Sequence, residues 1–341
     1  MSRLAHRLWV SSFAFVLFAL CYQFWRPIST NLATIVDNYL YSSHRLVDTY
    51  DFIPTEIERL CLRGAPLDEL STKTVIPNTV HYVIGLHDAE VSFPAYLSIL
   101  TALRSLSPTK VKLHHTDYLN VKNKYIQSLL QDNRVELVHH DAGSIASEMK
   151  QSSHYAHLAD VLRLKVLYAE GGIYLDSDVY ILQSFDPLRN SSRDVVLGYE
   201  GGNRAGLCNA VIVARAGAAF INRWMASYVD FSAREWNSHS VILPKKMADE
   251  HPTEVCTLSP HAFFWPTWTA RNVRWMHEPL NKEEAIKAQE MLDTNGGSYF
   301  EGQLAYHAWN QMAWKPYLRK LTEEIVKRHD TRFNLMIRRF L

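Results

Sequence analysis

Two acidic residues, Asp176 and Asp178, lie one residue apart directly after the short apolar run Ile173-Tyr174-Leu175. Carboxylate oxygens are the ligands that hard divalent cations prefer, and such cations complete their coordination with water and phosphate oxygens. A cation held by this pair could neutralise the charge that develops on a departing diphosphate. Because an Asp-x-Asp pair also occurs in solvated turns, the surrounding residues must decide between these two interpretations.

The residues before the acidic pair favour a ligand-binding site over a solvated turn. Residues 152–170 are expected to form a largely buried helix, because their apolar side chains cover a broad face. Asp160 and Arg163 are three residues apart on this helix and are therefore neighbours on its surface. A charged pair on an apolar helix costs desolvation free energy unless partners or a ligand compensate for it. Gly171-Gly172 can end the helix. The apolar run after it is expected to be a strand, so the acidic pair lies at a strand end, where open α/β sheets bind ligands.

Apolar runs and helical periods alternate through the rest of the chain. This alternation predicts an α/β fold, with a Rossmann-like, mostly parallel sheet that helices cover on both faces. The expected strands are 80–85, 111–115, 135–139, 173–175, 194–200 and 209–214, and the expected helices are 95–106, 118–131, 152–170 and 220–229.

Two later segments are harder to assign. Residues 244–266 are rich in Pro and aromatic side chains, and we expect them to be irregular. They could build part of an acceptor cleft or act as structural wedges. Residues 317–341 are expected to form a basic amphipathic helix, which either lies against a membrane or packs on the domain.

The segment ADVLRLKVLYAEGGIYLDSDV resembles the sugar-binding block of glycosyltransferase family 32, the family of the fungal α-1,6-mannosyltransferases. Animal α-1,4-galactosyltransferases share this block. Residues 76–83, 209–214 and 307–314 are similar to three further segments of the family. The resemblance spans residues 76–318 and implies a nucleotide-diphospho-sugar transferase fold of the GT-A type.

The resemblance also implies roles for the charged residues of the central block. Asp178 would coordinate the metal, and Asp176 would contact the donor ribose and, through water, the metal. Asp160 and Arg163 would hold hydroxyl groups of the transferred sugar, with Arg163 also near the phosphates.

Five residues outside the block receive roles in the same way. Tyr82 and Val83 belong to the strand that lines the nucleobase pocket, and Asn209 faces the donor sugar. His307 would be a third metal or phosphate contact, and Trp314 would donate to the diphosphate oxygens. A histidine packed between aromatic rings and a plain amide at the core edge remain the alternatives for His307 and Asn209.

The function implied is that of a metal-dependent, retaining hexosyltransferase. Its donor would be GDP-mannose, preferred because of the fungal members, or UDP-galactose or UDP-N-acetylglucosamine, and its acceptor a glycan or glycolipid. Oxygen and imidazole ligands suit Mn²⁺ or Mg²⁺, and the resemblance favours Mn²⁺. The alternatives are a non-catalytic membrane protein that binds nucleotide sugars or carbohydrate, and a glycoside hydrolase, which would have no use for the Asp160–Arg163 pair.

Charge and the N-terminal residues indicate a compartment. The net charge of +1 over 341 residues argues against nucleic acid as a partner. Residues 9–25 carry no charge and follow basic residues, so they predict a single-pass anchor with a cytoplasmic tail, residues 1–8. Residues 26–75 would be a stem, residues 76–318 a lumenal catalytic domain in the Golgi or endoplasmic reticulum, and residues 319–341 the basic helix. A cleaved signal peptide is the alternative.

The cysteines leave several alternatives open. Cys21 lies in the expected anchor, and Cys61, Cys208 and Cys256 follow it. Three lumenal thiols allow at most one internal bridge. Cys208 could pair with Cys256, Cys61 could pair between chains of a homodimer or transferase complex, or all three could be reduced and buried.

Overall fold

The structure is a computed structural model, and it describes residues 47–49, 53–62, 75–86, 88–141, 143, 155–230 and 237–341. The expected cytoplasmic tail, the membrane anchor with Cys21, and most of the stem lie outside these residues. Within the described ranges, no helix has the length and apolar character needed to span a membrane. Contacts divide the chain into the units Met1–Val47 and Asp48–Leu341, and the second unit holds all the elements described below.

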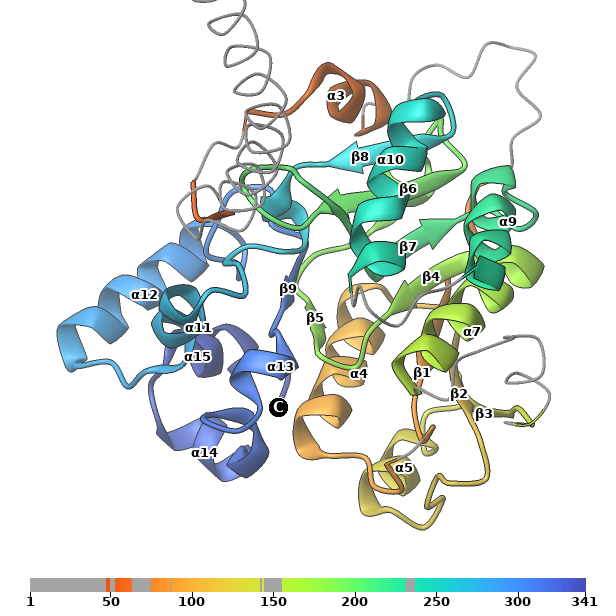
Figure 1. The fold of residues 1–341 in the computed structure, drawn as a ribbon. Helices are drawn as coiled ribbons and strands as arrows, with labels where there is room; N and C mark the ends of the chain where they lie inside the picture. Colours follow the sequence, from red (N-terminus) through yellow and green to blue (C-terminus); the bar gives the residue numbers. More distant parts are fainter. Residues whose placement is uncertain are drawn as a thin grey trace, which may run out of the picture. The chain divides into compact units, whose positions relative to one another are not determined.

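A seven-stranded sheet forms the centre of the second unit, in the order β3-β2-β1-β4-β7-β6-β8 (Figure 1). β1 is parallel to β2 and β4, β2 is parallel to β3, and β6 is parallel to β8. β7 runs antiparallel to both β4 and β6. The predicted mostly parallel sheet is therefore confirmed. The strands are β1 Thr79–Val83, β2 Lys110–His115, β3 Val135–His139, β4 Gly172–Leu175, β6 Val195–Tyr199, β7 Leu207–Ala214 and β8 Val255–Leu258.

Both faces of the sheet are buried, as expected for a mostly parallel sheet. Alternate residues of β4 point to opposite faces: Tyr174 belongs to the cluster that contains Leu162 and Trp224, whereas Ile173 belongs to the cluster that contains Leu97. The helices that supply these partners are α4 Phe93–Ser105, α7 Tyr155–Glu170 and α9 Ala219–Ala226.

A second, two-stranded sheet matters most for function. β5 Val179–Ile181 follows β4 almost at once and pairs antiparallel with β9 Ala305–His307, and Figure 1 shows the two strands side by side. β9 comes after the helices α11 Ala270–His277 and α12 Lys282–Thr294 and leads into α13 Asn310–Ala313. The pairing therefore brings a C-terminal segment to the end of β4.

The remaining elements are short. They are α3 Glu56–Leu62, α5 Lys124–Leu129, α8 Asp186–Arg189, η1 Ser227–Asp230, the π-helix η2 Ser238–Ile242, α10 Leu243–Glu250, η3 Pro260–Ala262, η4 Leu318–Lys320, α14 Glu323–Arg328 and α15 Arg332–Arg338.

Two helix predictions were wrong in extent. The expected helix 118–131 is only α5, because Asn123 caps it by accepting from the N–H groups of Tyr125 and Ile126. The expected single helix 317–341 is divided into η4, α14 and α15, because Thr322 and Thr331 each cap a new helix. The side chains of α15 are mostly buried, so this segment packs on the domain.

The expectation that residues 244–266 are irregular was also wrong. The segment contains α10 and β8, and every residue of β8 is buried because this strand pairs with β6 at the edge of the sheet. α3 packs beside it, where the Glu58 carboxylate accepts from the N–H and hydroxyl groups of Ser259. The compact unit therefore begins before residue 76.

All three described cysteines, Cys61, Cys208 and Cys256, are buried and free. This matches the alternative in which the thiols are reduced. Burial of Cys61 at 1% exposure also removes it from any surface that a second chain could reach.

Candidate active site

The acidic pair lies in the turn between β4 and β5. The Asp176 N–H group donates to Ala210 O on β7 at 2.9 Å, and the Val179 N–H group donates to Asp176 O at 3.0 Å. The turn is thus tied to β7 and closed on itself. These bonds hold the side chains of Asp176 and Asp178 at the end of the sheet.

The β5–β9 pairing brings His307 to this turn. His307 lies opposite Val179, the residue after Asp178. Its Nε2 atom is 3.2 Å from Asp178 Oδ1. Asp176, Asp178 and His307 each offer one ligand atom, and the three atoms lie within 4.8 Å of one another.

Burial and opposite charge compete within this trio. Burial would raise the pKa of Asp178, but the His307 imidazole and the Asn310 N–H group outweigh it and hold that pKa below its ordinary value. Burial would lower the pKa of His307, and the Asp178 carboxylate raises it instead. The pKa of Asp176 is raised by burial, against the opposing charge of Arg163. Asp178 and His307 are therefore a buried ion pair beside a less acidic Asp176.

The segment after β9 completes the surroundings of Asp178. The Asn310 N–H group donates to Asp178 Oδ2 at 2.8 Å. It can do so because Trp309 adopts a left-handed conformation, with φ 55° and ψ 59°, at the start of α13. Two contacts hold Trp309 there: its indole donates to Pro266 O at 2.9 Å, and its ring lies 4.1 Å from that of His307. Such a strained backbone persists only where surrounding contacts enforce it.

Arg163 connects helix α7 to the acidic turn. Its Nη2 atom is 3.1 Å from Asp160 Oδ1, and its Nη1 atom is 3.0 Å from Asp176 Oδ1. Nη1 also donates to Asn209 O at 2.9 Å, and the guanidinium lies 4.5 Å from the centre of the Tyr174 ring. Burial disfavours the charged form, but the carboxylates outweigh it and raise the pKa of Arg163. The planar fork of Arg suits this simultaneous pairing.

Asn209 joins the same network from β7. Its amide donates to Asp160 Oδ1 at 2.7 Å, and its side chain is buried. The Asp160–Arg163 pair on an apolar helix is thus compensated by Asn209 and Asp176.

A pocket of about 310 Å³ opens onto these groups. The strand ends that border it belong to four neighbouring strands of the sheet, β1, β4, β7 and β6. The residues predicted from the sequence that line it are Val83, Arg163, Asp176, Asp178, Asn209 and His307. Asp160 lies behind Arg163 and Asn209.

Two predicted donor-binding residues are not among the residues that line this pocket. Tyr82 is fully buried in the core, and its hydroxyl donates to Ser98 O at 3.4 Å. Its side chain points away from the pocket because neighbouring residues of a strand point to opposite faces, and Val83 faces the pocket. Trp314 packs half-buried against the core below α13. The pocket geometry therefore assigns no donor contact to either side chain, and both roles stay predictions.

Sequence reasoning assigned no role to several polar residues of the pocket, among them Glu200 and Asn310. Asn310 is close to His307 in the chain, and this proximity could have indicated it. Glu200 carries no local signal, because only the pairing of β6 with β7 brings it to the pocket. Burial raises the pKa of Glu200, and the Trp268 indole donates a hydrogen bond to its carboxylate.

The side chains at the acidic turn fit a small, hard cation. They are two carboxylates, an imidazole and the amide of Asn310, which is an oxygen and nitrogen set suited to Mn²⁺ or Mg²⁺. Among the described residues, His307 Nδ1 and Asn310 Oδ1 are buried without a hydrogen-bond partner. Buried polar atoms of this kind usually have a partner, so both are available to a ligand. In the described part of the chain, no other such group of three acidic, His or Cys residues could hold a metal.

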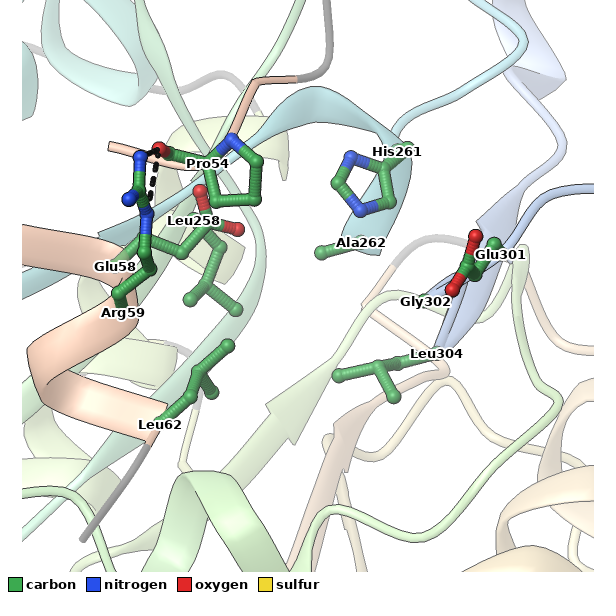
Figure 2. Close-up of a pocket in the computed structure, with 10 residues that line it drawn as sticks. All are labelled: Pro54, Glu58, Arg59, Leu62, Leu258, His261, Ala262, Glu301, Gly302 and Leu304. Atoms are coloured by element: carbon green, nitrogen blue, oxygen red, sulfur yellow. Dashed lines mark hydrogen bonds between the residues drawn. The ribbon is translucent and has the colours of Figure 1, made fainter. Parts of the chain in front are cut away.

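A second pocket, of about 630 Å³, lies beside α3. Figure 2 shows α3 on one side and residues 301–304 on the other. Its one buried acid, Glu58, is already bonded to Ser259. This pocket offers no comparable chemistry.

Comparison with known proteins agrees with the geometry of the first pocket. Residues 96–194 match the family model described as a glycosyltransferase sugar-binding region containing the DXD motif. A protein of Cryptococcus neoformans var. grubii named glucan organizing enzyme 1 is 34% identical over 322 residues, which cover 88% of this chain and 80% of that protein. Subversion of eukaryotic traffic protein A of Legionella pneumophila is 33% identical over 132 residues, or 38% of this chain and 20% of that protein.

Solved structures show weaker likenesses. The PaToxG glycosyltransferase is 18% identical with a TM-score of 0.39, covering 78% of this chain and 86% of that chain. The glycosyltransferase GlyE of Streptococcus pneumoniae is 11% identical with a TM-score of 0.44, covering 78% of this chain and 60% of that chain. Likenesses at this level identify neither a donor nor an acceptor.

The matched region contains the Asp160–Arg163 pair and both acids of the turn, and the fungal relative extends the match over most of the chain. The chain therefore belongs to the glycosyltransferases whose sugar-binding region contains the DXD motif, and it is a transferase enzyme.

Proposed function

We propose that this enzyme is a metal-dependent, retaining hexosyltransferase of the GT-A type that uses a nucleotide diphosphate sugar. The observation that carries the proposal is the junction of two groups in one pocket. The Asp176–Asp178–His307 trio could hold a cation, and the Asp160–Arg163–Asn209 network could hold a sugar, and Arg163 bonds to Asp176 across the two groups. A transferase needs both groups within the length of one donor molecule.

In this proposal Asp178, Asp176 and His307 hold Mn²⁺ or Mg²⁺, and the Asn310 amide lies beside them. When bound, the cation would neutralise negative charge on the leaving diphosphate. Asn310 N–H fixes Asp178 Oδ2, while Asp178 Oδ1 faces His307 within the trio that could hold the cation. Arg163 lies between the acidic turn and the sugar side, where a fixed guanidinium can stabilise phosphate charge without reorganising.

The transferred sugar would contact the network behind Arg163. Asp160 and Asn209 already share one hydrogen bond, which orients both groups. Asn209 lines the pocket, and its amide suits sugar hydroxyl groups, which can both donate and accept. A retaining reaction is inherited from the family resemblance, as is the acceptance of the acceptor proton by a leaving phosphate oxygen.

The donor preferred is GDP-mannose, with UDP-galactose and UDP-N-acetylglucosamine as alternatives, and the acceptor is a glycan or glycolipid. The name of the fungal relative adds a glucan to the acceptors worth testing. We place residues 9–25 in a Golgi or endoplasmic reticulum membrane, with the catalytic unit in the lumen, because these residues carry no charge and follow two arginines.

Nucleotide release tests this proposal. Wild-type protein is incubated with Mn²⁺ and each of the three donors, with and without simple glycosides, and release of GDP or UDP is measured. We expect one donor to be used, and Asp178→Asn to reduce release by at least about 100-fold, because charge stabilisation of this kind is worth that factor in other enzymes. The circular dichroism spectrum of Asp178→Asn should remain that of the wild type.

Two results would contradict the proposal. One is the absence of nucleotide release from every donor by the wild type. The other is equal release by Asp178→Asn and the wild type at saturating Mn²⁺.

A further inference from the structure

Glu200 is a carboxylate of the same pocket to which the network described above gives no task. Glu200 is not a member of the close ion pairs of Arg163 and His307, although the charge of His307 acts on it and opposes the effect of burial on its pKa. Its bonded neighbour is the Trp268 indole, which donates one hydrogen bond. An ionised carboxylate has about four acceptor positions, so one donor leaves most of them unfilled. The Glu200 side chain is partly exposed in the pocket, so a bound molecule can donate to the remaining positions.

Sheet order places Glu200 on a particular side of the pocket. Val83 ends β1, the acidic turn follows β4, Asn209 begins β7 and Glu200 follows β6, and these four strands are neighbours in that order. Backbone hydrogen bonds fix the positions of the last three strand ends: Asp176 N–H donates to Ala210 O on β7, and Glu200 N–H donates to Gly206 O just before β7. Glu200 and β1 are therefore at opposite ends of the row, with the acidic turn between them.

This order distinguishes the two substrates. The proposed function puts the diphosphate at the acidic turn, and the family resemblance of residues 76–83 implies a nucleoside at the β1 end. The β6 end is then left for the molecule that receives the sugar. That end holds the Glu200 carboxylate with the Trp268 indole that bonds to it, and the Trp309 indole lines the same pocket beside His307. Flat apolar rings beside a few fixed polar groups are the usual composition of a small-molecule site. Carboxylate oxygens accept from hydroxyl groups, and carbohydrate offers such donors.

We propose that Glu200, held by Trp268 in the pocket that Trp309 also lines, belongs to the acceptor subsite of this enzyme and accepts a hydrogen bond from an acceptor hydroxyl group. This inference rests on the proposed function. Glu200 acts here as a positioning and specificity residue. Trp268 orients the carboxylate through its indole N–H group, and Trp309 supplies the apolar wall.

Steady-state kinetics with Glu200→Gln tests the inference. The donor is the one that the wild type uses, and the acceptor probes are methyl α-D-mannopyranoside, methyl β-D-galactopyranoside and a glucan trisaccharide. Removal of a charged hydrogen-bond acceptor for a substrate hydroxyl should raise the acceptor KM by at least about tenfold. The donor KM and the affinity for GDP or UDP with Mn²⁺, measured by calorimetry, should stay within twofold. Trp268→Phe, which keeps a ring and loses only the N–H donor, should give a smaller rise in acceptor KM.

A matched control is Glu301→Gln, which alters a carboxylate of the second pocket in Figure 2. Its acceptor KM should equal that of the wild type. The inference is overturned if Glu200→Gln raises the donor KM as much as the acceptor KM, or if it changes neither. A wild type that uses no donor and no probe would instead refute the proposed function, so the two failures are distinguishable.

Discussion

At Arg163, one side chain links three segments that are far apart in the sequence. It contacts Asp160 on its own helix, Asp176 after β4 and the Asn209 carbonyl on β7. Asp160 also accepts from the Asn209 amide and Asp176 from the Tyr174 hydroxyl, but Arg163 supplies the positive charge that both buried carboxylates face. The position therefore combines stability and function in a single residue.

We predict that Arg163→Lys is not a conservative change. A lysine ammonium cannot pair with two carboxylates and a carbonyl in the fixed directions of the guanidinium. Leaving a buried charge without its partner costs about 3 kcal/mol of unfolding free energy, which urea denaturation would measure. Donor turnover should fall together with stability. Arg328→Lys, at an exposed ion pair on α14, should change neither quantity, and equal behaviour of the two variants would contradict the role of Arg163.

At the scale of elements, the start of β4 depends on a glycine. Gly172 has φ 109°, a conformation that other residues rarely adopt. A Cβ atom there would lie 2.5 Å from Thr79 O and 3.1 Å from His81 Nε2, both on the neighbouring strand β1. β4 can therefore approach β1 closely only with glycine at this position, and the acidic turn is at the other end of the same short strand.

We predict that Gly172→Ala destabilises the protein and displaces the acidic turn. Backbone strain alone costs about 1–3 kcal/mol, and the contact with the Thr79 carbonyl adds to it. Gly217→Ala is the matched control, because Gly217 also has a positive φ, 72°, but its Cβ would meet nothing within 4 Å. Unfolding curves and Mn²⁺-dependent turnover should both fall more for Gly172→Ala. Equal losses in the two variants would show that the contact with β1 has no importance.

The elements also show how far the sequence could predict this structure. Apolar runs such as that of β7, buried along its whole length, located six strands of the large sheet, but they did not reveal β8 or the short strands β5 and β9. The C-terminal helix was predicted too long because the spacing of apolar side chains continues where the backbone leaves the helical conformation. Thr322 and Thr331 mark the starts of the new helices. The position of His307 came from family resemblance, since no local pattern predicts that β9 pairs with β5. Glu200 could not be found at all, because its place depends on the register between β6 and β7.

At the β3-β2-β1 side of the sheet, three histidines form a continuous chain of hydrogen bonds. His81 Nδ1 is 3.0 Å from His114 Nε2, and His114 Nδ1 is 2.8 Å from His140 Nε2. At the far end, His81 Nε2 is 3.0 Å from Gly171 O. A carbonyl oxygen can only accept, so His81 Nε2 must carry a proton and donate it. His81 Nδ1 then accepts from His114, and His114 Nδ1 accepts from His140, which gives all three rings the same neutral tautomer.

Because the three hydrogen-bonded histidine rings are neutral, the free energy of unfolding should fall as the pH is lowered. Burial, with the neighbouring histidines, lowers the pKa of His114 to about 2, and burial lowers the pKa of His81 and His140 as well. Unfolded histidine titrates near pH 6.5. Below that pH the unfolded state binds protons that the folded state does not, so stability is complete above about pH 6.5 and is lost as pH falls below it.

We predict that His114→Gln weakens this pH dependence. Glutamine can still accept from His140 and donate to His81, but it does not titrate. The neutral His114 accounts for roughly 2 kcal/mol of stability lost between pH 6.5 and pH 5.0, so the fall in unfolding free energy over that range should be smaller by this amount in the variant. Urea denaturation at both pH values measures it, with His329→Gln on the exposed surface as the control. If His114→Gln and the wild type lose the same stability on acidification, His114 is not held neutral by the fold.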